Sequence, residues 1–319
     1  MTNKEKYRRY CKTTKDVILF QRDWWLDAVC GAEYWDAVVY ESNANIVGAW
    51  AYPIKKKYNL KLIAMPMLTL GIGPVITYFL GQKYASLLSH ERQVIEELHK
   101  QLPSFDLFDL YFLPIYKNQM AFHWKGFIQK NRYTYRINDI SNLDKVFEEF
   151  NSSIRSQIRK AEKEITVVES EDIELFYKIN SLTFKRQNKQ VPYSLSYVKQ
   201  IEEACKKNDC RKILLAKDKE GNIHAAVYIV WDNQSAYYLM GGADETYKSS
   251  GAYSLLLWCA IKTSSNLTKQ FNFCGSMLPT VERFFRSFGG EQIPYLQLKK
   301  VNNKALKLFL SLKEHNTGS

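Results

Sequence analysis

The spacing of apolar residues along the chain predicts an alternation of β-strands and amphipathic helices. Short apolar runs bounded by Gly, Pro, Asn or Asp predict strands, and apolar residues at i, i+3, i+4 and i+7 predict helices. Near the C-terminus, one such helical stripe is formed by Val281, Phe284, Phe285 and Phe288. Gly289-Gly290 ends this helix, because glycine readily adopts the left-handed cap conformation. Arg283 and Arg286 lie off the stripe, so they are either solvated charges or ligands for something anionic.

The same reading gives a similar order of elements in both halves of the chain. In the first half it predicts a short helix at 22–31, a hairpin from 36–41 and 46–53, a strand at 60–65 and a helix at 82–101. A strand at 105–114, a short helix at 117–126 and a strand at 127–139 follow. In the second half it predicts helices at 152–164 and 172–187, a three-stranded meander at 212–242, a helix at 252–265, and strands at 270–274 and 293–301.

Each half runs hairpin, helix, strand, short helix closed by glycine, strand. Such repetition of pattern without clear identity of residues predicts two similar α/β domains in tandem. The boundary is expected between Arg136 and Leu143, where polar residues interrupt the pattern. We therefore predict an N-terminal domain over 1–138 and a C-terminal domain over 139–319.

Charge and composition limit the class of protein. The chain is 46% hydrophobic and carries a formal net charge of +12, which favours an anionic partner unless it reflects a general bias toward lysine. The longest apolar run, 62–80, is broken by Pro66, Gly71, Gly73 and Pro74, so no transmembrane segment is predicted. The six cysteines have no metal-ligand spacing, so no metal is expected. The N-terminus does not resemble a signal peptide, and we expect a cytoplasmic protein with reduced thiols.

Three segments resemble the FemABX family of aminoacyl ligases, which is built from two GNAT acyltransferase domains. The segment 155–161, RSQIRKA, resembles the R-x-x-I-R/K-K-A helix that opens the second domain of that family. The segment 285–289, FRSFG, is similar to its F-K-x-x-F-G signature, with Arg286 in place of lysine. The segment 66–71, PMLTLG, resembles a P-x-L-T loop of the first domain. The basic residue expected after the first-domain tryptophan helix is missing here.

The resemblance implies acyl transfer to an amine, often on a cell-envelope precursor, with aminoacyl-tRNA as donor in the best-known branch. In a GNAT-like domain the fourth strand separates from its neighbour, and here that strand is SAYYLMGG. Gly241 and Gly242 would then let a donor approach the backbone closely, unless the glycine pair only ends the strand.

The loop after this strand is the second candidate for donor binding. Lys248, Gly251 and Ala252 partly match the Q/R-x-x-G-x-G/A pattern with which GNAT domains bind the pyrophosphate of acetyl-coenzyme A, but Tyr253 fills the last small position. An ordinary helix cap would explain the same residues. Asp244, Glu245 and Tyr247 are candidate proton acceptors at the mouth of this loop, although a loop carboxylate is often only solvated.

Two groups of basic residues are candidates for substrate binding. Arg155, Arg159 and Lys160 share one helix, where they form either a solvated face or, as the family motif suggests, a phosphate site. The others are Arg283 and Arg286, of which Arg286 is the better candidate for a ligand-facing, catalytic cation. If both groups bind one anionic substrate, they share a cleft.

We predict an N-acyltransferase that acts on an amine of a phosphate-bearing envelope or polysaccharide intermediate, either a small molecule or lipid-linked. Its co-substrate is an acyl-coenzyme A or an aminoacyl-tRNA, with no tightly bound cofactor. The alternative is a non-catalytic basic protein that binds RNA or an anionic glycan on a degenerate GNAT-like scaffold.

Overall fold

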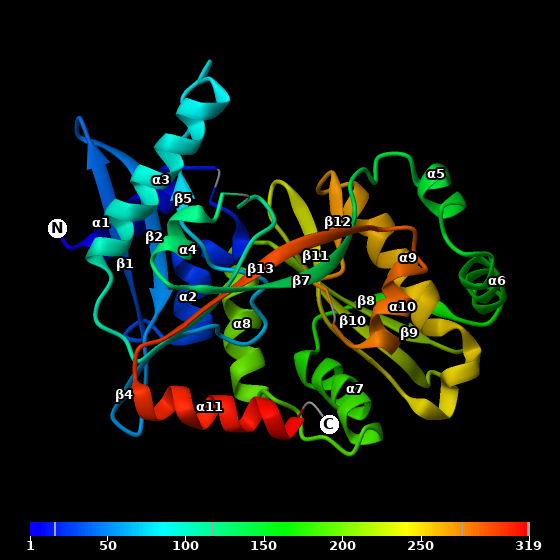
Figure 1. Ribbon diagram of the computed structural model, residues 1–319. Helices are drawn as coiled ribbons and strands as arrows, with labels where there is room; N and C mark the ends of the chain where they lie inside the picture. The colour runs from blue at the N-terminus through cyan, green and yellow to red at the C-terminus, as the bar shows by residue number, and fades with distance from the viewer. Residues whose placement is uncertain (16, 117, 276, 318–319) are drawn as a thin grey trace. The chain divides into compact units, whose positions relative to one another are not determined.

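The computed structural model describes residues 1–15, 17–116, 118–275 and 277–317, and it divides into two compact units (Figure 1). Unit 1 contains residues 1–132 together with 295–319, and unit 2 contains residues 133–294. Both combine helices with mainly antiparallel sheets, so the predicted mixed α/β architecture is confirmed.

Unit 1 is built around two sheets, ordered β1-β2-β5 and β3-β4-β6-β13. Its helices are α1 (Asn3–Thr13), α2 (Asp23–Cys30), α3 (Tyr84–Gln101), α4 (Met120–Trp124) and α11 (Lys304–Thr317), with a short helix η1 (Leu19–Gln21). Its strands are β1 (Trp35–Ser42), β2 (Asn45–Pro53), β3 (Lys55–Lys57), β4 (Leu60–Ala64), β5 (Val75–Ile76) and β6 (Leu107–Phe112), with the second part of β13 (Glu291–Val301).

Aromatic side chains from several elements of unit 1 meet around Trp50. This indole is fully buried and makes edge contacts, at centroid distances of 5.5 to 5.9 Å, with Phe108, Phe112 and Phe122. On β2, Gly48 lies where an added Cβ would come within 2.2 Å of the Val94 side chain, so helix α3 packs directly against the strand.

Unit 2 contains the sheet β7-β12-β11-β10-β9-β8. Its strands are the end of β7 (Ile128–Ile137), β8 (Thr166–Ser170), β9 (Arg211–Lys217), β10 (Ile223–Trp231), β11 (Ser235–Ala243) and β12 (Gln270–Asn272). Its helices are α5 (Leu143–Glu148), α6 (Ser152–Ala161), α7 (Ile173–Arg186), α8 (Leu195–Lys207), η2 (Glu245–Ser250), α9 (Ala252–Ser265) and α10 (Pro279–Arg286).

Alternate residues of β10 show that helices cover both faces of this sheet. Val227 and Ile229 belong to the same core cluster as the α9 side chains, whereas Tyr228 packs against Phe176 of α7 and donates a hydrogen bond to Glu202 of α8. Since successive strand residues point to opposite faces, α9 and the α7–α8 pair lie on different sides of the sheet.

The last strand of each half of the chain pairs within the other unit. Strand β7 follows the elements of unit 1 in sequence, yet its end pairs antiparallel with β12 in unit 2, at Phe271↔Ile137 and Asn272↔Arg136. Strand β13 follows unit 2, yet it pairs with β6 in unit 1 from Leu296↔Phe112 to Val301↔Leu107. The prediction of two continuous domains, 1–138 and 139–319, did not anticipate the return of β13, because sequence pattern identifies a strand but not its neighbour.

Leu298 of β13 tests this exchange, because it is fully buried opposite Leu110 of β6. We expect Leu298→Ala to lower the free energy of unfolding by about 2–5 kcal/mol, as measured in urea. Amide hydrogen exchange should show the loss of protection mainly in β6, although the substitution lies in the C-terminal part of the chain.

Leu312→Ala is the matched control, because this side chain is 58% exposed and its loss should change stability by less than about 0.5 kcal/mol. Equal loss of protection in β9 and β10 would contradict the assignment of β13 to unit 1.

Candidate functional site

Strand β11 leaves its neighbour β12 part-way along its length. The two strands pair in parallel over only three residues, from Ser235↔Gln270 to Tyr237↔Asn272, and β11 then continues to Ala243 alongside β10. A β-bulge interrupts the β10–β11 register at the same place, with Ile229 opposite Tyr238 and Tyr228 opposite Met240. The bulge and the short β12 together free one backbone edge of β11 between Tyr238 and Ala243.

A cavity of about 500 Å³ lies over this free edge, within the usual size range of small-molecule sites. Its walls come from β11, the start of α9, helix α10 and the end of α7, with Gln157 contributed by α6. Two basic side chains, Arg186 and Lys248, are among the lining residues.

Four of the five predicted donor-binding residues line this cavity. They are Gly241, Lys248, Gly251 and Ala252. Gly251 has a φ of +73°, and an added Cβ would come within 2.7 Å of the Gln157 carbonyl oxygen. Only glycine fits both conditions, so Gly251 sets the close approach of α6 to the beginning of α9.

The fifth predicted donor-binding residue, Gly242, faces away from the cavity. A Cβ on Gly242 would lie 2.5 Å from Asn180 Cα and 2.6 Å from the Ile179 carbonyl oxygen, both in the backbone of α7. Asn180 also donates a 2.9 Å hydrogen bond to the carbonyl oxygen of Gly241. Gly242 therefore allows α7 to pack against β11.

Two tyrosine side chains narrow the cavity above Gly241. The hydroxyls of Tyr238 and Tyr253 are 2.5 Å apart, and they would lie 2.5 and 2.7 Å from a Cβ added to Gly241. The Tyr253 ring stacks on Phe284 of α10. Burial raises the pKa of Tyr253 to about 12, so this hydroxyl is neutral at physiological pH.

The mouth of the cavity holds two of the predicted catalytic residues and one histidine that the sequence did not indicate. The Asp244 carboxylate accepts a 2.9 Å hydrogen bond from the Thr246 amide and caps η2. Tyr247 stacks on the imidazole of His224, with ring centroids 3.9 Å apart.

His224 lines the cavity, and its Nε2 lies 3.0 Å from Asp218 Oδ2. Its Nδ1 is buried and has no hydrogen-bond partner among the described residues. Hydrogen bonds from Asn222 and His224 lower the pKa of the Asp218 carboxyl to about 2, so this carboxylate is charged and orients the imidazole.

Comparison with known proteins agrees with this geometry. Residues 149–275 match the model of an acetyltransferase (GNAT) domain. These residues form a GNAT domain. Among solved structures, FemX is similar with a TM-score of 0.68, at 15% identity, over 97% of this chain and 98% of FemX.

Two further solved structures share the fold. The C-terminal domain of a putative lysylphosphatidylglycerol synthetase from Agrobacterium fabrum has a TM-score of 0.56 at 11% identity, over 97% of this chain and 96% of that one. A tandem GNAT protein from the clavulanic acid biosynthesis pathway has a TM-score of 0.50 at 10% identity, over 84% and 82%. A search of curated proteins finds no match.

The predicted arginine clusters lie on helices of unit 2 but outside the cavity wall. Arg155 donates hydrogen bonds to the carbonyl oxygens of Glu148 and Phe150, and the guanidinium of Arg159 lies 5.7 Å from the centre of the Phe147 ring. Arg286 Nε pairs with Glu282 at 2.9 Å, and the Arg286 side chain is 60% exposed. The described residues that line the cavity include none of Arg155, Arg159, Lys160, Arg283 and Arg286. Their convergence on one substrate stays a prediction.

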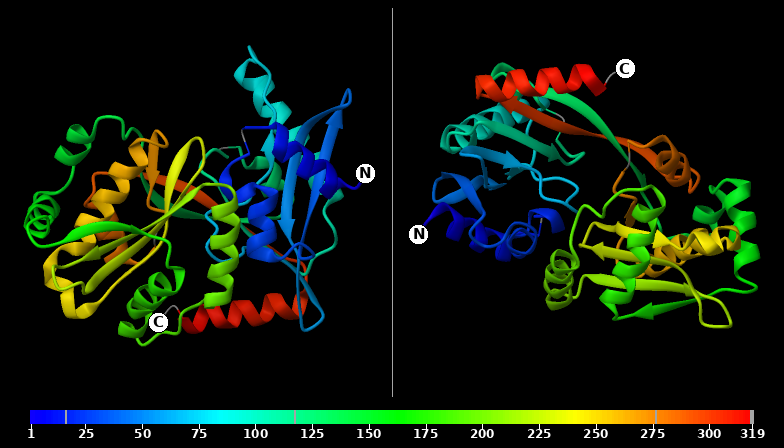
Figure 2. Two further views of the ribbon diagram at one scale, coloured as in Figure 1. Left: turned by 180° about the vertical axis from the view of Figure 1, so that it is seen from behind. Right: turned by 90° about the horizontal axis from the view of Figure 1, so that it is seen from below.

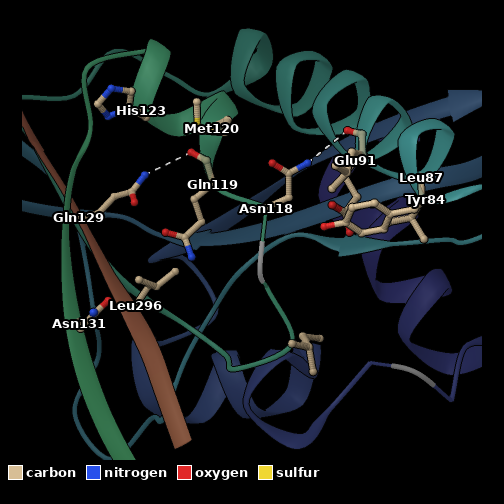
Figure 3. A pocket seen from close by; sticks show the side chains of 12 residues that line it. Tyr84, Leu87, Glu91, Asn118, Gln119, Met120, His123, Gln129, Asn131 and Leu296 are labelled. Carbon is tan, nitrogen blue, oxygen red and sulfur yellow. Dashed lines mark hydrogen bonds between the residues drawn. The ribbon is translucent and has the colours of Figure 1, made fainter.

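Unit 1 has a cavity of its own, of about 700 Å³, between α3, α4 and strands β7 and β13 (Figure 3). The amide nitrogens of Asn118 and Gln129 donate to the carbonyl oxygens of Leu88 and Gln119, both at 3.2 Å. The side-chain carbonyl oxygens of Asn118 and Gln129 accept no hydrogen bond from the described residues and can serve as acceptors, and Glu91 adds a carboxylate. The described lining contains no lysine or arginine, so this cavity suits ligands that donate hydrogen bonds rather than phosphates.

Neither a metal centre nor a membrane span was expected. Over the described ranges there is no group of three or more His, Cys, Asp or Glu side chains that could hold a metal ion. No helix in the same ranges is both long and apolar enough to cross a bilayer.

The two adjacent glycines of β11 give a matched pair of test substitutions. We expect Gly242→Ala to lower the free energy of unfolding by about 1–3 kcal/mol, because the new methyl group meets the backbone of α7. Gly241→Ala should cost less, since the atoms it meets belong to tyrosine side chains that can turn away. Urea unfolding of both variants measures the difference. A larger loss for Gly241→Ala would contradict the packing role of Gly242.

Proposed function

We propose that the chain is an N-acyltransferase whose acyl donor binds in the GNAT-domain cavity along the free edge of β11. The observation that carries the proposal is that the bulge, the end of the β11–β12 pairing and the cavity coincide. A separated strand edge offers backbone N–H groups to a ligand that runs beside it, and to the oxyanion that forms when its carbonyl is attacked.

The reaction joins an amine to the acyl carbon of a thioester or an ester. The amine nitrogen attacks, a C–N bond forms, and the C–S or C–O bond breaks to release a thiol or a hydroxyl group. The attacking nitrogen must also lose a proton. Asp244 and Tyr247 are our candidates for guiding that proton, and the Asp218–His224 pair adds an imidazole in the same wall.

We assign the donor to acyl-coenzyme A or aminoacyl-tRNA. Lys248 and the α9 N-terminus after Gly251 favour an anionic group at that end of the cavity, as either donor would supply. The acceptor we propose is an amine on a phosphate-bearing envelope or polysaccharide intermediate, bound through Arg155, Arg159, Lys160, Arg283 and Arg286. The similar fold of a lysylphosphatidylglycerol synthetase, whose name joins an aminoacyl group to an anionic phospholipid, agrees with this class of acceptor.

One observation favours the alternative of a non-catalytic binding protein. The paired hydroxyls of Tyr238 and Tyr253 occupy the space directly above Gly241, where a donor would pass. Transfer of a radiolabelled acyl group from acetyl-coenzyme A or aminoacyl-tRNA to an amine decides between the two functions. A chain that binds donor or RNA without transfer would support the alternative.

Tyr253 tests the donor site. Tyr253→Ala removes both the hydroxyl above Gly241 and the stack on Phe284, so the cavity becomes larger. We expect acetyl-coenzyme A, measured by calorimetry, to bind the variant at least as tightly as the unmodified chain. Tyr253→Phe is the control, because it keeps the stack and removes only the hydroxyl.

A tenfold weaker binding to Tyr253→Ala, with Tyr253→Phe unchanged, would show that the ring itself contacts the donor. Tight binding of acetyl-coenzyme A to the unmodified chain would show that Tyr253 does not obstruct the pyrophosphate loop.

Arg286 tests the acceptor site. Glu282 engages Nε, so a substrate phosphate would pair with the outer Nη atoms of the guanidinium. Arg286→Met keeps the apolar stem and removes the charge, and we expect the KM for the acceptor to rise about ten- to a hundredfold. Arg286→Lys should recover part of the loss, because lysine restores the positive charge without the paired N–H donors of the guanidinium.

Arg9→Met is the control for charge alone, since Arg9 is an exposed arginine of α1. An Arg286→Met enzyme with unchanged kinetics would mean that Arg286 is a solvated charge.

A further inference from the structure

Helix α11 exposes apolar side chains that no other element covers within the part of the chain that the structure describes. Leu308, Phe309 and Leu312 are 63%, 61% and 58% exposed. Of residues 304–312, the part of α11 whose side chains are described, Leu306 and Leu310 are only half-buried and the others are exposed.

An amphipathic helix gains most of its stability by covering its apolar face. The apolar face of α11 packs little against its own unit. A lipid bilayer or a second protein molecule would therefore stabilise the helix by covering this face. Three neighbouring exposed side chains of this size are more than the scattered apolar residues of an ordinary protein surface.

Lysines accompany this apolar face. Lys304 and Lys307 are exposed on the same helix, one turn before Leu308 and Ser311 respectively. The adjacent β3–β4 hairpin adds Lys55, Lys56 and Lys57, all exposed, and Tyr58, which is 86% exposed at its turn.

Asp106 connects the hairpin to the start of α11 within unit 1. Its carboxylate accepts hydrogen bonds from the Lys61 amide of β4 at 2.8 Å and from the side chain of Asn303 at 3.2 Å. Asn303 in turn accepts a hydrogen bond from the Leu306 amide in the first turn of α11. The Asp106 carboxylate thus holds the hairpin and α11 together. The lysines give this surface its positive charge.

We propose that α11 and the β3–β4 hairpin attach the chain to the surface of an anionic lipid bilayer. Leucine and phenylalanine side chains would enter the boundary of the acyl chains, the tyrosine would lie at headgroup level, and the lysines would contact lipid phosphates. Exposed lysines together with exposed apolar side chains match a bilayer that carries negative charge at its surface and hydrocarbon beneath.

This attachment is independent of the proposed acyl transfer, because none of its residues lines the GNAT-domain cavity. It would place the chain at a surface and leave its reaction with water-soluble substrates unchanged.

Vesicle sedimentation with the full chain tests the proposal. We expect binding to vesicles that contain phosphatidylglycerol at low salt, with at least tenfold weaker binding to phosphatidylcholine alone. Raising the salt concentration should weaken binding, because each lysine near the surface contributes an electrostatic attraction that salt screens.

Two variants separate the apolar and the electrostatic parts. Phe309→Ser should lower the vesicle partition coefficient about tenfold, and the pair Lys56→Gln and Lys57→Gln together should lower it by about tenfold or more. Leu80→Ser, at a fully exposed leucine elsewhere in unit 1, and Lys219→Gln, at an exposed turn of unit 2, are matched controls that should bind like the unmodified chain.

Failure to sediment with phosphatidylglycerol vesicles overturns the proposal, and so does equal binding by Phe309→Ser. If the unmodified chain self-associates on gel filtration and Phe309→Ser makes it monomeric without any lipid binding, the face is a protein interface instead. Acyl transfer to a water-soluble amine should be the same in all these variants, so its failure would count against the proposed function alone.

Discussion

The exchange of terminal strands is the constraint on which both units depend. Strand β6 has three fully buried aromatic and aliphatic side chains, Phe108, Leu110 and Phe112, and its partner β13 comes from the far end of the chain. In unit 2, the end of β7 covers the outer edge of β12 in the same way. The unit 1 sheet is incomplete until β13 has been made at the far end of the chain, and an uncovered β6 or β12 would be an exposed edge open to wrong pairing.

The same constraint shapes the candidate site. Strand β12 has only three residues, and it holds β7 on one side and the start of β11 on the other. Beyond Tyr237, β11 pairs with no strand on that side among the described residues, and the bulge turns its backbone where the pairing ends. The helices on either side then fix the walls, because Gly251 lets α6 approach α9 and Gly242 lets α7 approach β11. The cavity is therefore a result of a short strand and two close helix contacts rather than of a special loop.

Much of this architecture could be predicted from the sequence because it depends on local pattern. Helix α9 begins and ends where predicted, at Ala252 and Ser265, and the stripe around Phe284 and Phe285 forms α10. Helices α1, α5, α8 and α11 were not predicted. In α8, Val198, Ile201 and Cys205 have helical spacing and Ser194 caps the first turn, so the signal was present but overlooked between polar residues. In α11, a buried apolar stripe could not have indicated the helix, because residues 304–312, whose side chains are described, are exposed or half-buried.

Contacts between distant segments were the harder part of the site to predict. His224 and Asp218 face each other across the β9–β10 turn, which the sequence did predict, so the turn could have drawn attention to the pair. By contrast, no spacing indicates that Gly242 meets the backbone of α7, or that Tyr238 and Tyr253 join hydroxyls. These contacts depend on how the helices pack on the sheet, and the pattern of apolar residues in the sequence does not specify that packing.

The distribution of positive charge changes what the net charge of +12 implies. Arg186 and Lys248 are the only arginine and lysine among the described lining residues of the GNAT-domain cavity, and the described lining of the unit 1 cavity has none. Arg155 and Arg159 are partly engaged by carbonyl oxygens and an aromatic ring, and Arg286 by Glu282. Much of the positive charge therefore lies on outer surfaces such as the β3–β4 hairpin and α11, where it would attract large anionic partners rather than a bound small molecule. A basic isoelectric point is thus weak support for an anionic substrate in this chain, and the case for acyl transfer depends on the geometry of β11.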